Sequence, residues 1–299
     1  MIHSNSEGDI YIEEMPLLLV HLREEEKGAD ARLSEVLSYA LDGYAYETAT
    51  EISAFEDYVN RWRRLEMTQN RKNPVQGRIL FAVPLGTSGI NLELYCLIRF
   101  LREHPDFLNG FVGGLLVDSE NDLYSKSAAK DLVFAANCAG CAFVGRPLVE
   151  GTRTLSNYTI VSNNLGTDLM GAYRESAAGL VKEVLGTDCV RKKCPKVLVL
   201  HASSHKTSNT YAIWNRVKEQ LPEMEIREIG LRNGTLSDCA GCPYKMCLHF
   251  GEQGSCFYGG VMVEDVYPAV READAIVMLC PNYNDALSAN LTAFINRLT

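Results

Sequence analysis

The sequence predicts an α/β protein with two doubly wound parallel sheets in tandem, the second of them truncated at its C-terminal end. Short apolar runs alternate with amphipathic stretches of helical period, which is typical of parallel strands covered by helices. The order of these elements starts again near residue 196, which indicates a degenerate duplication. A length of 299 residues agrees with two domains of about 150 residues each.

The first domain is expected over residues 1–165. Its strands are short runs of aliphatic and aromatic residues, at 16–22, 44–52, 78–84, 110–117 and 141–144. The helices between them carry apolar residues three to four positions apart, at 31–41, 55–67, 92–101 and 125–137. Residues 146–164 are expected to form a loop or arm. Cys138 and Cys141 are interpreted as core residues, with Cys138 on the buried face of its helix.

Residues 166–195 are predicted to connect the domains, as an amphipathic helix followed by a basic linker. The second domain covers residues 196–299. Its expected strands lie at 197–200, 225–231 and 275–280, and its helices at 211–221, 263–272 and 286–298. A parallel sheet of three strands leaves an apolar edge. We therefore expect further C-terminal sequence, or completion of the sheet by a partner.

The composition excludes several classes of protein. A hydrophobic content of 46% and a charged content of 22% are ordinary for a soluble globular protein. The net charge of −9 argues against nucleic acid or an anionic membrane as a partner. No apolar run approaches the ~20 residues of a membrane span. The first fifteen residues are polar and acidic, unlike a targeting peptide, so we expect a cytoplasmic protein whose ten cysteines are not disulfides.

The strand at 197–200 runs into residues 203–210, which all carry a hydroxyl, amide or basic group. A strand that turns into a helix through such residues builds an anion site, because free N–H groups and the helix dipole face the anion. The alternative is a polar loop with an N-cap, which would need only one serine or asparagine. We predict a phosphate-binding loop.

A second polar loop, Cys280–Asp285, follows the last expected strand. In open α/β sheets, ligands bind at the carboxyl ends of the strands, so this loop would face the phosphate loop. Tyr283 could stack on a flat aromatic ligand, while Asn282 and Asn284 supply amides. The alternative is a turn that uses proline and asparagine for conformation alone. The pairing of the two loops favours a flavin nucleotide.

A third region is rich in cysteine. Four thiols in a glycine-containing loop can converge on one metal centre, and they are Cys239, Cys242, Cys247 and Cys256. Their spacing is neither that of a ferredoxin nor that of a zinc ribbon. An iron–sulfur cluster, a structural zinc ion and free or redox-active thiols therefore remain as alternatives.

Two of these regions resemble a known family. The loop Ala202–Thr210, ASSHKTSNT, resembles the G-S-P-R-x-x-G/S-N-T phosphate loop of the NADPH-dependent FMN reductase family. The cysteine-rich insert is similar to that of the family's iron–sulfur flavoprotein branch. Ala293–Leu298, AFINRL, resembles the family's motif in the helix after the third strand. The resemblance covers about residues 196–299 and implies a flavodoxin-like fold that binds FMN.

The resemblance also implies the roles of individual residues. The FMN phosphate would be held by Ser203, His205, Lys206, Ser208, Asn209 and Thr210. The isoalloxazine ring would be flanked by Pro281, Asn282, Tyr283 and Asn284. No catalytic acid or base is assigned, because the flavin itself carries the redox chemistry.

The first domain is similar to a flavodoxin-like domain only in the order of its elements. Its first strand is followed by Glu24, Glu25 and Glu26, where a phosphate loop would stand. Each carboxylate would repel a phosphate by ~1 kcal/mol at contact distance. We therefore do not expect this domain to bind FMN in the usual way. The Leu85–Gly89 loop is interpreted as a tight turn, with a small-anion site as the alternative.

The expected function is an FMN-dependent NAD(P)H oxidoreductase that passes electrons to a small-molecule or protein acceptor. A 4Fe-4S cluster on the four cysteines would relay electrons. The alternatives are a non-catalytic electron-transfer flavoprotein and a cofactor-free interaction module. The family resemblance also implies a homo-oligomer, because its members commonly build the flavin site across a subunit interface.

Overall fold

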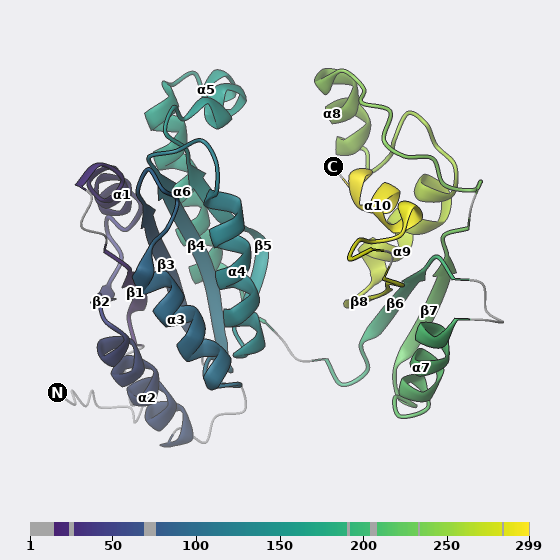
Figure 1. The fold of residues 1–299 in the computed structure, drawn as a ribbon, viewed down its shortest axis with the longest axis horizontal. Coiled ribbons are helices and arrows are strands. Elements are labelled where there is room, and N and C mark those ends of the chain that lie inside the picture. The colour runs from purple at the N-terminus through teal and green to yellow at the C-terminus, as the bar shows by residue number, and fades with distance from the viewer. Residues whose placement is uncertain are drawn as a thin grey trace, which may run out of the picture. The chain divides into compact units, whose positions relative to one another are not determined.

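The computed structural model describes residues 15–23, 27–68, 76–189, 192–203, 208–232, 234–282 and 284–298. The chain divides into two compact units, Met1–Val190 and Arg191–Thr299, and each unit has its own parallel sheet (Figure 1). The predicted α/β class with tandem parallel sheets is therefore confirmed.

The first unit is a five-stranded parallel sheet with the order β2-β1-β3-β4-β5. The strands are β1 (Leu17–His21), β2 (Tyr46–Ala49), β3 (Gly77–Leu85), β4 (Phe111–Ser119) and β5 (Ala142–Gly151). All nine residues of β4 are buried, as expected for a central strand that is covered on both faces. This strand order is that of flavodoxin-like domains, whose ligands bind at the carboxyl ends of the strands.

Helices cover both faces of this sheet. They are α1 (Lys27–Ala40), α2 (Ile52–Thr68), α3 (Leu92–Glu103), α4 (Ser125–Cys138), α5 (Thr159–Leu165) and α6 (Leu169–Gly186). One core lies between the sheet and α2, α3 and α4, and the other between the sheet and α1, α5 and α6. Figure 1 shows α3 and α4 in front of the sheet and α6 behind it. Leu18 and Leu19 of β1 belong to opposite cores, because successive strand residues point to opposite faces.

The helix predicted within the connecting segment 166–195 packs into the first unit. Tyr173, Ala177 and Val181 of α6 are fully buried in the core that α1 also covers. The Arg78 guanidinium donates to the carbonyl of Val184 at 2.9 Å, which ties the end of α6 to β3. The structure thus places this helix with the first sheet, and the connection between the units begins after it.

Strand β5 is longer than predicted. The sequence prediction ends the strand at residue 144, but pairing with β4 resumes at Leu148 and continues to Gly151. The register shifts between Gly113, which pairs with Phe143, and Leu115, which pairs with Leu148. The extra residues of β5 at this irregularity interrupt the alternation of apolar and polar residues, so the sequence pattern does not predict the second half of the strand.

The structure also corrects the interpretation of Cys138. Cys138 is exposed, because the buried face of α4 passes through Leu132, Ala135 and Ala136 and turns away from it. Cys141 is buried as predicted, and burial raises the pKa of its thiol.

The second unit is a three-stranded parallel sheet with the order β7-β6-β8. The strands are β6 (Lys196–His201), β7 (Glu225–Gly230) and β8 (Ala275–Leu279). The helices are α7 (Asn209–Lys218), α8 (Tyr244–Glu252), α9 (Tyr267–Glu272) and α10 (Ala289–Asn296), and a π-helical turn, Met262–Val266, precedes α9. The order repeats β2-β1-β3 of the first unit. The side chains of Ile276 and Met278 on β8 are 43% and 44% exposed, so the predicted apolar edge is present.

Among the helices that the structure describes, none is long and apolar enough to cross a membrane.

Candidate functional site

The predicted anion site lies between the carboxyl end of β6 and the start of α7, and the structure describes both ends of this segment. Strand β6 is buried from Val197 to His201, and Ser203 follows its carboxyl end. Ser208 is the N-cap of α7, and its Oγ accepts a hydrogen bond from the Tyr211 N–H at 3.2 Å. Asn209 and Thr210 form the first turn of the helix, where backbone N–H groups have no intrahelical acceptor. Such N–H groups and the helix dipole attract a phosphate. His205 and Lys206 lie outside the described residues.

Helix α7 is held along its length by hydrogen bonds to one carboxylate on β7. Glu228 accepts from the Tyr211 hydroxyl at 2.5 Å, from the Lys218 ammonium at 2.8 Å and from the Trp214 indole at 3.3 Å. Burial alone would raise the pKa of Glu228, but these donors together lower it to about 2. Sequence reasoning missed this carboxylate, because the alternating pattern of β7 indicates only a strand. The network fixes α7 relative to the sheet.

The loop after β8 reaches the same edge of the sheet as the β6–α7 turn. Strands β6 and β8 are adjacent and parallel, and His201 pairs with Leu279. Ser203 and Pro281 therefore each stand two residues beyond paired positions, where neighbouring strands are ~5 Å apart. The structure thus brings the two predicted halves of the site to one edge.

The amide of Asn282 closes its own loop. Its Oδ1 accepts from the Asp285 N–H at 2.7 Å, and its Nδ2 donates to Asp285 Oδ1 at 3.2 Å. Asn284 and Asp285 have left-handed backbone, with φ of 52° and 59°. These features support the conformation of the turn, which is the alternative interpretation, and the contact of the two amides with a ligand stays a prediction. Tyr283 lies outside the part of the chain that the structure describes.

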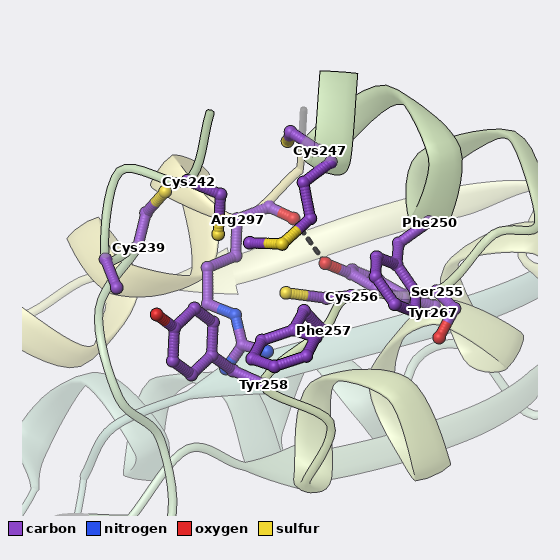
Figure 2. Close-up of a pocket in the computed structure, with 12 residues that line it drawn as sticks. Cys239, Cys242, Cys247, Phe250, Ser255, Cys256, Phe257, Tyr258, Tyr267 and Arg297 are labelled. Atoms are coloured by element: carbon purple, nitrogen blue, oxygen red, sulfur yellow. Dashed lines mark hydrogen bonds between the residues drawn. The ribbon is translucent and has the colours of Figure 1, made fainter. Parts of the chain in front are cut away.

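The four predicted metal-ligating cysteines line a single pocket (Figure 2). Cys239 and Cys242 lie in the loop after β7, Cys247 is on α8, and Cys256 follows that helix. Phe250, Phe257, Tyr258 and Tyr267 also line the pocket. Figure 2 shows the sulfur atoms of Cys242 and Cys256 directed into the pocket. The sequence spacing therefore identified four residues that the fold gathers together.

The sulfur atoms do not form a coordination sphere in this structure. Within the described ranges, no group of three or more His, Cys, Asp or Glu side chains is placed to hold a metal ion. The space in the pocket is about 30 Å³, which accommodates one or two water molecules or a single ion. A four-iron cluster would require the side chains to move apart.

A buried arginine also lines the thiol pocket. The Arg297 side chain is 5% exposed, and its guanidinium donates to the carbonyl oxygens of Gly259 at 3.0 Å and Ser237 at 3.4 Å. No carboxylate among the described residues forms an ion pair with it. A buried charge is unfavourable without a countercharge, so the pocket is suited to an anionic group. Sequence reasoning missed this role, although Arg297 belongs to the motif quoted above.

The fold and these two loops define a class of protein. The second unit, with its parallel sheet in the order β7-β6-β8 and a helix that starts near the carboxyl edge of β6, has the arrangement of a flavodoxin-like unit, in which ligands bind at that edge. Residues 195–299 match the family model of NADPH-dependent FMN reductase, which confirms the predicted resemblance. The matched residues lie in the second unit, and the first unit lies outside the match. Comparison with curated proteins and with solved structures found no match.

Proposed function

We propose that the protein is an FMN-dependent NAD(P)H oxidoreductase whose flavin binds to the second unit. The main support is that the adjacent parallel strands β6 and β8, which lead into the two predicted loops, end at one sheet edge inside the residues that match the reductase family. The phosphate would be held at the start of α7 by Ser203, Ser208, Asn209 and Thr210, together with His205 and Lys206. The flavin ring would lie against Pro281–Asn284.

Two features of the described residues would preorganise this site for a phosphate group. Because Ser208 Oγ accepts from Tyr211, its O–H proton remains available for a phosphate oxygen. The Glu228 network holds α7 against β7, the strand next to β6, so an anion can bind at the start of the helix with little movement of α7. FMN, when bound, supplies the exchange of hydride and single electrons.

Reconstitution of the full chain with FMN tests this proposal. The protein should become yellow, with absorption near ~370 and ~450 nm that is typical of bound flavin. It should then oxidise NADH or NADPH in the presence of a quinone, a free flavin or a dye. Bound flavin without turnover with any acceptor would instead indicate the electron-transfer protein. A chain that stays colourless would favour the cofactor-free interaction module.

We further propose that the thiol pocket binds an iron–sulfur cluster. Its support is the donor chemistry, with four thiols beside a buried guanidinium. A metal–thiolate centre is anionic and would neutralise Arg297. Since the sulfur atoms are not arranged for coordination here, metal binding would be coupled to rearrangement of the cysteine loop. Such a cluster, when bound, supplies single-electron transfer.

Replacing Cys242 or Cys256 by serine should remove most of the bound metal, because each of these thiols points into the pocket. The measurement is iron, zinc and acid-labile sulfide per chain after anaerobic reconstitution. Cys138→Ser is the matched control, because Cys138 is an exposed thiol of the first unit. Zinc without sulfide would favour the structural zinc site. A wild-type chain that retains neither metal would contradict the proposal.

A further inference from the structure

The first unit contains a cavity of about 400 Å³ that the flavin proposal does not use. It is lined by Ala29 and Arg32 of α1, and by Thr87, Glu120 and Arg153 from the loops after β3, β4 and β5. The cavity therefore lies at the carboxyl edge of the sheet, next to β1 and β3. Doubly wound sheets bind their ligands at this edge.

The charge on one wall of the cavity is fixed in place. Asp118, which is fully buried at the end of β4, accepts from Arg32 Nε at 2.9 Å and from Arg32 Nη2 at 2.6 Å. Arg32 also donates to the carbonyl oxygens of Ser119 and Arg153, each at 3.1 Å. One hydrogen of Nη1 remains without a partner among the described residues. Buried ion pairs contribute little net stability, so this pair is better explained by the positioning of Arg32.

The loops around the cavity are tied to one another. Asn121 Nδ2 donates to the Thr87 carbonyl at 3.1 Å, which joins the loops after β3 and β4. The N–H and hydroxyl of Thr154 donate to Asp122 at 3.2 and 3.0 Å, which joins the loops after β4 and β5. The sequence predicts a tight turn at Leu85–Gly89, and the structure has one that also directs Thr87 to the cavity. A site held in this way loses little entropy on binding.

Besides Arg32, two charged side chains line the cavity among the residues that the structure describes, and they have opposite signs. The Arg153 guanidinium makes no hydrogen bond or ion pair with the described residues, and its nearby acid, Asp122, already accepts two bonds from Thr154. Glu120 accepts only one described bond, from the Ala29 N–H at 3.1 Å. The cavity therefore offers a cation for an anion and a carboxylate for a hydrogen-bond donor.

We propose that this cavity binds a small carboxylic acid with an amino or hydroxyl group beside its carboxylate. The planar carboxylate matches the fork of the Arg153 guanidinium. The amino or hydroxyl group donates to Glu120. A phosphate dianion is disfavoured, because its second charge would face Glu120. The first unit is thus a ligand-binding domain for an amino acid or a 2-hydroxy acid.

Saturation-transfer NMR on the full chain tests this site. The probes are the twenty L-amino acids, lactate, glycerate and malate, with acetate and inorganic phosphate measured separately. We expect at least one amino or hydroxy acid to bind with submillimolar Kd. Arg153→Gln should weaken it at least tenfold. Glu120→Gln should weaken that ligand and leave acetate unaffected. Arg146→Gln, at an exposed arginine of β5, is the matched control and should bind as wild type.

The result is independent of the flavin site, because these variants should all retain the flavin content of the wild-type chain. The proposal is overturned if none of the amino or hydroxy acids binds, if inorganic phosphate binds more tightly than all of them, or if Arg153→Gln binds as wild type. A wild-type chain that binds one of these acids and takes up no flavin would instead count against the proposed oxidoreductase alone.

Discussion

Replacing Asn209 by glutamate should strongly weaken FMN binding and leave the second unit folded. Asn209 is the first residue of α7, where an acidic side chain stabilises the helix through its dipole. The same carboxylate would stand against the phosphate. Repulsion between unit charges at 4 Å is ~1 kcal/mol in bulk water and ~4 kcal/mol near a protein surface. Since the phosphate carries up to two charges, we expect affinity to fall by at least about a hundredfold.

The measurement is flavin per chain and Kd by quenching of flavin fluorescence. Asn215→Glu introduces the same charge at an exposed position of the same helix, away from its N-terminus, and should bind FMN as wild type. Circular dichroism should report equal helix content in both variants. Equal flavin affinity in the two variants would contradict the assignment of the α7 N-terminus to the phosphate.

Replacing Asp118 by alanine should destabilise the first unit by about 3–5 kcal/mol, because it leaves Arg32 without its buried partner. The chain has two tryptophans, Trp62 in α2 and Trp214 in α7. In a Trp214→Phe background, tryptophan fluorescence during urea unfolding therefore reports on the first unit. The midpoint of that transition should fall markedly.

Two further variants separate this effect from a general loss of packing. Asp118→Leu combined with Arg32→Met should recover most of the free energy of unfolding, because it removes both charges together. Asp122→Ala, at an exposed carboxylate of the next loop, should cost about 1 kcal/mol or less. If Asp118→Ala costs no more than Asp122→Ala, the buried pair does not have the role inferred here.

Local patterns in the sequence determined the order and type of the elements. Ile79–Leu85 and Phe111–Val117 are continuous apolar runs, and such runs form central parallel strands because both of their faces are buried. The repeated order of strand and helix likewise predicted two sheets. The phosphate loop and the loop after β8 were predicted as neighbours, because the carboxyl ends of parallel strands share one edge.

Contacts between distant segments were decided by the tertiary structure. The Arg32–Asp118 pair joins residues 86 positions apart, and the pattern around either residue indicates only a helix or a strand. Helix α6 is a second example. Its apolar face predicts that the helix packs against a sheet, but the sequence does not indicate which of the two sheets it covers. Arg297 meets the four thiols only after α10 folds back beside the cysteine loop. Sequence periodicity thus determined which elements form, because it reflects local burial, whereas packing determined the contacts between distant segments, such as that of Arg297 with the thiol pocket.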